Sequence, residues 1–170
     1  RNLLEQYDNV ILSDEGIWTM TCNKRKSLWR ELAEEADKHG FTVKIIVYLR
    51  SQDSYLCSSW NQTVKVGAID ACTETWEEYL ADVPKLKQPD YAEKLDTIAA
   101  EIGRENIIVR RFEKESFAGG SIYGDFLDAV GLKLDDGYVI GQEFRNGGLS
   151  GNTHEIKRIL NTLHPDREQN

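Results

Sequence analysis

Residues 42–62, with the sequence TVKIIVYLRSQDSYLCSSWNQ, restrict the possible folds of this chain more than any other segment. Six apolar residues, four of them β-branched, lie between Val43 and Leu49, a composition typical of a strand that is buried on both faces. Residues 50–53 are polar and predict a turn, after which Asp53 is expected to cap a helix, because its carboxylate can accept a free amide at the helix start. The segment therefore predicts strand, turn and helix in succession.

Two side chains in this segment are suited to binding an anion. Arg50 stands where the strand is expected to end, and Ser58 follows eight positions later, one to two turns into the helix. An arginine binds phosphate bidentately, a helix N-terminus adds partial positive charge, and ligands favour the carboxyl ends of strands in open α/β sheets. The alternatives are an ion pair between Arg50 and Asp53 and a purely structural role for Ser58.

The rest of the chain repeats the alternation of strands and helices. Further apolar strands are expected at residues 9–13 and 106–110. Apolar residues at helical spacing predict helices at residues 24–39, 74–81, 91–102 and 152–163, and a helix within residues 117–130 that starts near Gly120. Residues 133–151 are expected to form a loop. Strand–helix–strand–helix order predicts an α/β fold with a parallel sheet.

Other candidate site residues also follow predicted strands. Asp14 and Glu15 come after the first strand, where a carboxylate could serve as a general base or simply cap a turn. Arg110 ends the third strand at the same edge as Glu15 and Arg50 if all three strands are parallel, and a structural ion pair is its alternative role. Asp125 and Asp128 are expected to face solvent.

Composition narrows the classes of function. The chain has 170 residues, which suits one domain, and its formal net charge of −8 argues against broad binding to nucleic acid or anionic membranes. Its three cysteines lack metal-type spacing and are odd in number, which favours a reducing compartment, the cytoplasm. The three histidines are scattered and expected to be exposed, so no metal site is predicted. No apolar run is long enough to cross a bilayer, and the oligomeric state stays open.

Residues 43–62 resemble the second phosphosulfate-binding segment of the sulfotransferase superfamily, in which a buried strand ends in Arg and a Ser follows eight residues later. The chain from about residue 9 to 161 is similar to the bacterial, carbohydrate-modifying branch of that superfamily. The motifs that carry the similarity are Ser13-Asp14-Glu15, Arg50-Ser51-Gln52-Asp53, Trp60-Asn61-Gln62 with Lys65 and Gly67, Asp90-Tyr91, Gly103 with residues 106–110, residues 125–127 with Gly131-Leu132, and Leu149-Ser150 before Lys157-Arg158 and Leu160-Asn161.

The resemblance implies a three-layer, P-loop-NTPase-like parallel sheet flanked by helices, formed by residues 1–170 as one domain. It implies that PAPS (3′-phosphoadenosine 5′-phosphosulfate) is the sulfuryl donor and that Arg50 and Ser58 hold its 3′-phosphate. Glu15 takes the position of the base that deprotonates the acceptor hydroxyl, with Asp14 as the alternative. The implied acceptor is a hydroxyl of a carbohydrate, and no metal is required.

The chain departs from this superfamily in one respect. The first phosphate-binding loop, which grips the 5′-phosphosulfate and precedes all of these segments, is absent from the sequence. Either an N-terminal strand, loop and helix are missing from this chain, or donor activation has been lost and the domain serves protein contacts. A nucleotide phosphotransferase would share the fold but needs a Walker-type loop and a Mg²⁺-binding acid, which the sequence does not show. Residues 144–148 resemble the loop that closes over the nucleotide, with one glycine out of register, and a plain flexible loop is the alternative.

Overall fold

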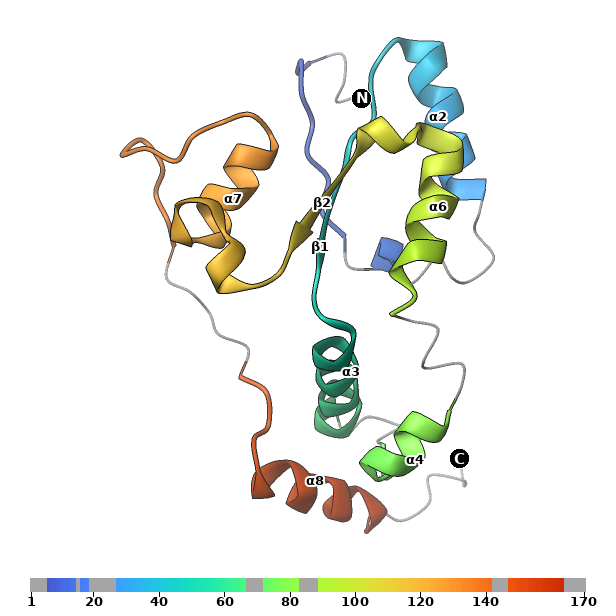
Figure 1. Ribbon diagram of the computed structural model, residues 1–170, viewed down its shortest axis with the longest axis vertical. Helices are drawn as coiled ribbons and strands as arrows, with labels where there is room; N and C mark the ends of the chain where they lie inside the picture. Colours follow the sequence, from blue (N-terminus) through green and yellow to red (C-terminus); the bar gives the residue numbers. More distant parts are fainter. Residues whose placement is uncertain are drawn as a thin grey trace. The chain divides into compact units, whose positions relative to one another are not determined.

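The computed structural model describes residues 6–14, 16–18, 27–66, 72–82, 89–141 and 147–163. The protein is a mixed α/β chain (Figure 1) that divides into two compact units. The first unit comprises Arg1–Val43 and Ala92–Asn106, and the second comprises Lys44–Tyr91 and Ile107–Asn170. None of the helices in the described ranges combines the length and apolarity that crossing a membrane requires.

The first unit contains helix α2, Ser27–His39, and most of helix α6, Tyr91–Ile102. Both helices were predicted from their apolar stripes, and both predictions are confirmed. Arg30 of α2 forms an ion pair with Glu101 of α6, with 3.3 Å between the charged atoms. Four apolar side chains of these helices are buried: Trp29, Ala36, Ile98 and Ile102. The short 3₁₀ turn η2, Arg104–Asn106, closes the unit.

Residues 9–13 do not form the strand that the sequence predicted. Ile11 is 64% exposed and Leu12 is 80% exposed. A buried strand needs both a ladder partner and apolar cover, and the described residues supply neither to this segment. Three consecutive apolar residues are thus too weak a pattern to define a strand by themselves.

The sheet of the described residues lies in the second unit and consists of two parallel strands. Strand β1 spans Ile45–Leu49 and strand β2 spans Ile107–Arg111, and both predicted strands are therefore confirmed. Their register pairs Ile45 with Ile107 and Leu49 with Arg111. The carboxyl ends of both strands consequently meet at one edge of the sheet, as predicted for Arg50 and Arg110.

Short helical elements follow each strand. Helix α3, Gln52–Val66, follows β1 after a two-residue turn. After β2 come the 3₁₀ turns η3, Lys114–Ser116, and η4, Ala118–Gly120, and then helix α7, Ile122–Ala129. The Ser121 hydroxyl caps α7 by accepting the Gly124 amide at 3.1 Å, so this helix begins later than predicted.

The start of helix α4, Trp76–Ala81, is fixed by a capping box at Thr75. The Thr75 hydroxyl accepts the Glu78 amide at 3.2 Å, and the Glu78 carboxylate accepts the Thr75 amide at 2.8 Å. These two bonds satisfy helix-start amides reciprocally, which places the first turn two residues later than predicted.

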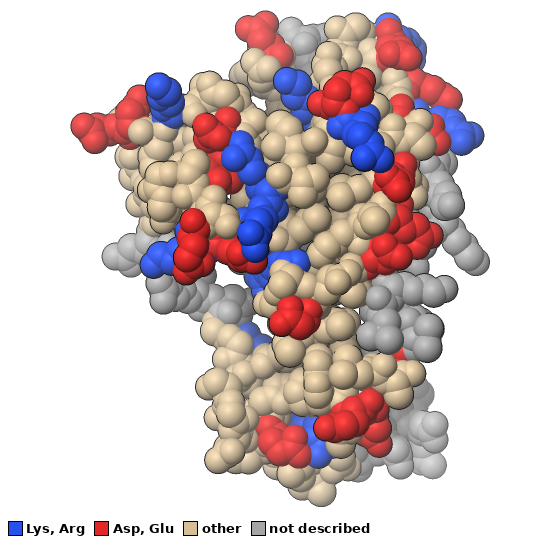
Figure 2. All heavy atoms as spheres, viewed as in Figure 1, with Lys and Arg blue, Asp and Glu red and all other residues tan. Residues whose placement is uncertain are grey.

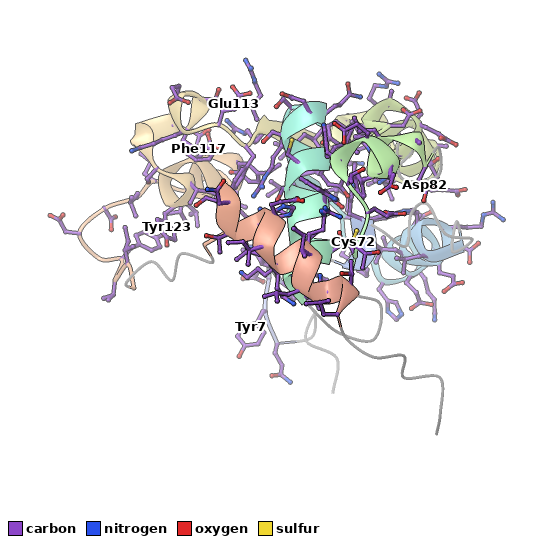
Figure 3. The ribbon with its side chains drawn as sticks, turned by 90° about the horizontal axis from the view of Figure 1, so that it is seen from below. Tyr7, Cys72, Asp82, Glu113, Phe117 and Tyr123 are labelled. Atoms are coloured by element: carbon purple, nitrogen blue, oxygen red, sulfur yellow. The ribbon has the colours of Figure 1, made fainter. Side chains whose placement is uncertain are left out.

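Helix α8, Asn152–Thr162, lies against α3 (Figure 3). His154 and Asn161 are buried, so the prediction that the histidines are exposed is wrong for His154. The outward face instead carries an apolar stripe at helical spacing. Its exposed members are Ile156 at 57%, Ile159 at 48%, Leu160 at 49% and Leu163 at 69%.

Candidate functional site

Arg50 and Ser58, the two residues of the predicted anion site, contact each other. Arg50 Nη1 donates to Ser58 Oγ at 3.2 Å. The pair joins the carboxyl end of β1 to the second turn of α3, beside the amides of the helix start. A cation, a hydroxyl and the positive end of a helix dipole are thus brought together at one edge of the sheet.

Phe112, the residue that follows strand β2, contacts the Arg50 guanidinium. The Arg50 Cζ atom lies 4.6 Å from the centroid of the Phe112 ring, a cation–π contact. Phe112 is itself held because its amide donates to the Leu49 carbonyl at 2.8 Å, extending the β ladder by one bond. The Arg50 side chain is exposed, and Ser58 takes one of its five N–H donors. The remaining donors can reach an anion.

Asp53 is not the N-cap residue of α3, although its carboxylate accepts an amide of the first turn, and it forms no ion pair with Arg50 among the described residues. Helix α3 begins at Gln52, so Asp53 lies inside its first turn. Hydrogen bonds from the Ser51 side chain and then from the Ser54 amide lower the pKa of its carboxyl. Its negative charge therefore stabilises the helix start and also opposes an anion bound there.

Arg110 has the structural role that was its alternative. Its Nη2 atom lies 2.7 Å from Asp128 Oδ2, and its Nη1 atom lies 3.8 Å from Asp125 Oδ2. On the face drawn in Figure 2, basic and acidic side chains lie next to one another, as such ion pairs require. Arg110 is therefore an intramolecular ion-pair partner.

Asp125 is buried, which contradicts the prediction that it faces solvent; Asp128 is exposed as predicted. The Asp125 carboxylate accepts the Ala118 amide at 2.9 Å and the Tyr48 hydroxyl at 2.6 Å. These bonds hold the pKa of Asp125 below its usual value. The carboxylate links β1, η4 and α7, and this accounts for its burial: a buried charge persists when it is paired and hydrogen-bonded.

The base candidates after residue 13 have different outcomes. Glu15 lies outside the described residues. The Asp14 carboxylate accepts the amides of Gly16 and Ile17 and caps the helical turn that begins at Gly16. Asp14 thus takes the capping role, and the assignment of the base to Glu15 stays a prediction.

Segment 147–151 is held against α3 by two side chains of that helix. The Asn61 amide nitrogen donates to the Leu149 carbonyl at 2.6 Å, and the Leu149 amide donates to Asn61 Oδ1 at 3.1 Å. Lys65 Nζ donates to the Gly147 carbonyl at 3.1 Å. Residues 144–146 of the predicted nucleotide loop lie outside the described residues.

The next helix is anchored by Asn161. Its side-chain nitrogen donates to the carbonyls of Val64 at 3.1 Å and Cys72 at 3.0 Å. Figure 3 shows the labelled Cys72 close to α8. The Trp60-Asn61, Lys65, Leu149 and Asn161 motifs of the sequence are consequently parts of one structural assembly between α3 and α8.

A hollow of about 470 Å³ that was not predicted from the sequence lies beside this assembly. Its lining among the described residues comprises Cys57, Trp60, Asn61, Trp76, Leu149, Gly151, His154 and Glu155. The Trp60 ring lies between His154, at 4.1 Å between centroids, and Trp76, at 5.3 Å. The rings come from positions up to 94 residues apart, so no local spacing could have revealed the cluster.

His154 lines this hollow and carries a buried ring nitrogen that lacks a hydrogen-bond partner among the described residues. The residue is 6% exposed, and its Nε2 atom has no hydrogen-bond partner among the described residues. Burial lowers the pKa of the imidazole, which favours its neutral form at pH 7. Buried polar atoms are usually paired, so this nitrogen is an exception among the described residues.

The described residues contain no cluster of three or more His, Cys, Asp and Glu side chains that could hold a metal ion. Cys57 and Cys72 are free thiols.

No family model and no solved structure matches the chain. A protein of Archaeoglobus fulgidus, described as an uncharacterized protein, is 33% identical over 93 residues, which are 55% of this chain and 23% of the archaeal protein. The chain therefore spans about a quarter of the length of that relative.

Proposed function

We propose that this chain provides the 3′-phosphate-binding half of a PAPS-dependent sulfotransferase. The observation that carries the proposal is the contact between Arg50 and Ser58, at 3.2 Å, at the carboxyl end of a parallel strand. The same two residues carry the sequence resemblance to the sulfotransferase superfamily. Their geometry and their spacing thus support the same ligand.

The residues present fit a phosphate group. Ser58 accepts from Arg50 and keeps its own hydroxyl proton to donate. The exposed Arg50 guanidinium, in contact with Phe112, can offer two parallel N–H donors to phosphate oxygens. The first-turn amides of α3 add partial positive charge on the same side.

The complete reaction is sulfuryl transfer from PAPS to a hydroxyl of a carbohydrate. Such a transfer depends mostly on positioning and charge stabilisation, as phosphoryl transfer does. Glu15 is the proposed base for the acceptor hydroxyl. The reaction also needs a loop that grips the 5′-phosphosulfate, and these 170 residues do not contain its motif.

The proposal extends to the fold and the compartment. The parallel pair β1 and β2, with α3 following β1, is the arrangement expected at the centre of a three-layer, P-loop-NTPase-like domain. Two free thiols fit a reducing compartment such as the cytoplasm.

One observation favours a second function, a non-catalytic interaction domain on the same scaffold. The outward stripe of α8, from Ile156 to Leu163, is apolar and exposed. Contiguous apolar patches on a protein surface often mark sites of interaction with another protein.

Nucleotide binding distinguishes the two functions. We expect calorimetry to show that adenosine 3′,5′-bisphosphate binds at least about tenfold more tightly than adenosine 5′-monophosphate. The reason is that a charge-assisted hydrogen bond to phosphate is worth about 1.5–3 kcal/mol. Equal affinities for the two nucleotides, or no binding of either, would contradict the sulfotransferase proposal and leave the interaction domain.

A further inference from the structure

We propose that Phe112 is a positioning residue of the phosphate site, whose ring holds the Arg50 guanidinium beside Ser58 before an anion binds. The inference rests on the proposed function, because it concerns how the same arginine is prepared to bind the 3′-phosphate. Arg50 and Ser58 come after strand β1, whereas Phe112 comes after β2. The paired strands thus bring a third residue to the site from 62 positions along the chain.

The partners of Arg50 differ from those of the two arginines that end the neighbouring strand. Arg110 and Arg111 pair with carboxylates at 2.7 Å and 2.8 Å, whereas Arg50 has no acidic partner among the described residues. Its guanidinium instead lies 4.6 Å from the centroid of the Phe112 ring. An aromatic face attracts a cation without cancelling its charge, as a carboxylate would. Arg50 is therefore held in place and keeps its charge for an anion.

The Phe112 ring is itself held by two other rings. It meets Tyr48 with 6.4 Å between centroids and an interplanar angle of 86°, and Phe117 at 5.8 Å and 73°. Tyr48 and Phe117 meet at 6.3 Å and 77°. All three contacts are edge-to-face, the arrangement that aromatic pairs favour. The Tyr48 hydroxyl donates to the buried Asp125 carboxylate at 2.6 Å, which ties the cluster to α7.

This arrangement favours binding because it restricts Arg50 in advance. A free arginine side chain loses rotamer freedom when it binds a ligand, and that loss weakens the affinity. Phe112 is 37% exposed, so its ring covers the guanidinium at the surface and does not fill the core. The ring should therefore contribute to affinity more than to stability.

The test is calorimetric binding of adenosine 3′,5′-bisphosphate to the wild type, Phe112→Leu and Phe112→Trp. We expect about two- to fivefold weaker binding in Phe112→Leu, which stays apolar but lacks a ring face. Phe112→Trp should bind at least as tightly as the wild type, because an indole attracts cations best. Tyr123→Leu on α7 is the control: Tyr123 is 39% exposed and belongs to no ring pair among the described residues, so the affinity should not change.

Two further measurements separate positioning from a merely structural role. Phe112→Leu should have no further effect on affinity in the Arg50→Ala background, because the guanidinium on which the ring acts is gone. A ring that only supported the fold would weaken binding equally in both backgrounds. In the protein without nucleotide, the Phe112 ring current should shift the Arg50 Hδ proton resonances upfield, and Phe112→Leu should abolish that shift.

The outcomes distinguish this inference from the proposed function. Binding that is weakened in Arg50→Ala but unchanged in Phe112→Leu would overturn the inference and leave the proposed function standing. Equal losses in both backgrounds, or Arg50 proton shifts that are the same in the wild type and Phe112→Leu, would also overturn it. No binding by the folded wild type would contradict the proposed function and the inference with it.

Discussion

The side chain of Asn61 exchanges two hydrogen bonds with the backbone of Leu149, across 88 positions of sequence. The Asn61 side chain thus bonds both the carbonyl and the amide of Leu149, as a neighbouring strand would, and holds segment 147–151 against α3. The same contact closes one side of the hollow that contains His154. The packing of segment 147–151 on α3, and with it the stability of the protein, should therefore depend on Asn61.

Replacing Asn61 by Ala should lower the free energy of unfolding by about 1–3 kcal/mol, because both backbone groups of Leu149 lose their partners. Urea denaturation followed by circular dichroism would measure the loss. Gln62→Ala is the matched control, since Gln62 is the next residue of the same helix and is exposed. Equal losses in the two variants would show that the Asn61 contact contributes nothing specific.

Asp125 should make stability dependent on pH. Hydrogen bonds from the Ala118 amide and the Tyr48 hydroxyl lower its pKa in the folded protein. The stabilisation is therefore fully present above the unfolded carboxyl pKa, about pH 4, and is lost as the pH falls through the lower folded value. Asp125→Asn should cost about 1.5–3 kcal/mol at pH 7 and clearly less near pH 3.

The comparison that tests this account is Asp128→Asn. Asp128 pairs with the same Arg110, but its side chain is 58% exposed, so its loss should cost less than about 1 kcal/mol. Urea denaturation of the wild type and both variants at pH 7 and pH 3 would measure the loss of stability for each variant at each pH. A loss for Asp125→Asn that is the same at pH 7 and pH 3 would contradict the proposed role of its charge.

Asp53 should weaken any anion bound beside Arg50. Replacing it by Asn removes a negative charge from the first turn of α3, and we expect adenosine 3′,5′-bisphosphate to bind about two- to fivefold more tightly. Helix stability should fall slightly at the same time, because the hydrogen bonds that lower the pKa of Asp53 are weakened. Asp37→Asn on α2 is the control, since it changes the net charge by the same amount. An equal gain in nucleotide affinity in Asp37→Asn would show that only the net charge of the protein matters.

Local patterns in the sequence predicted the residues around Arg50 well. Strand β1, helix α3 and the meeting of Arg50 with Ser58 all depend on neighbours within eight positions, and the apolar run and helical periodicity determine them. Strand β2 was predicted from its own apolar run, and its parallel pairing with β1 from the alternation of strands and helices.

Contacts between distant segments were not predictable in this way. The side of α8 that packs inward is decided by partners on α3, with Asn161 bonding the Val64 carbonyl and His154 packing on Trp60. Helical periodicity in the sequence did not predict that the apolar stripe of α8 faces outward. Asp125 was misplaced because its partners Tyr48 and Ala118 come from other elements.

The most direct test of the central claim is calorimetric binding of adenosine 3′,5′-bisphosphate to the wild type, Arg50→Ala and Arg111→Ala. Arg111 ends the neighbouring strand and is exposed, with a 2.8 Å ion pair to Glu113, so it controls for lost charge. The account predicts an affinity at least about tenfold weaker in Arg50→Ala and nearly unchanged in Arg111→Ala. Equal affinity in the wild type and Arg50→Ala, or no binding by the folded wild type, would contradict it.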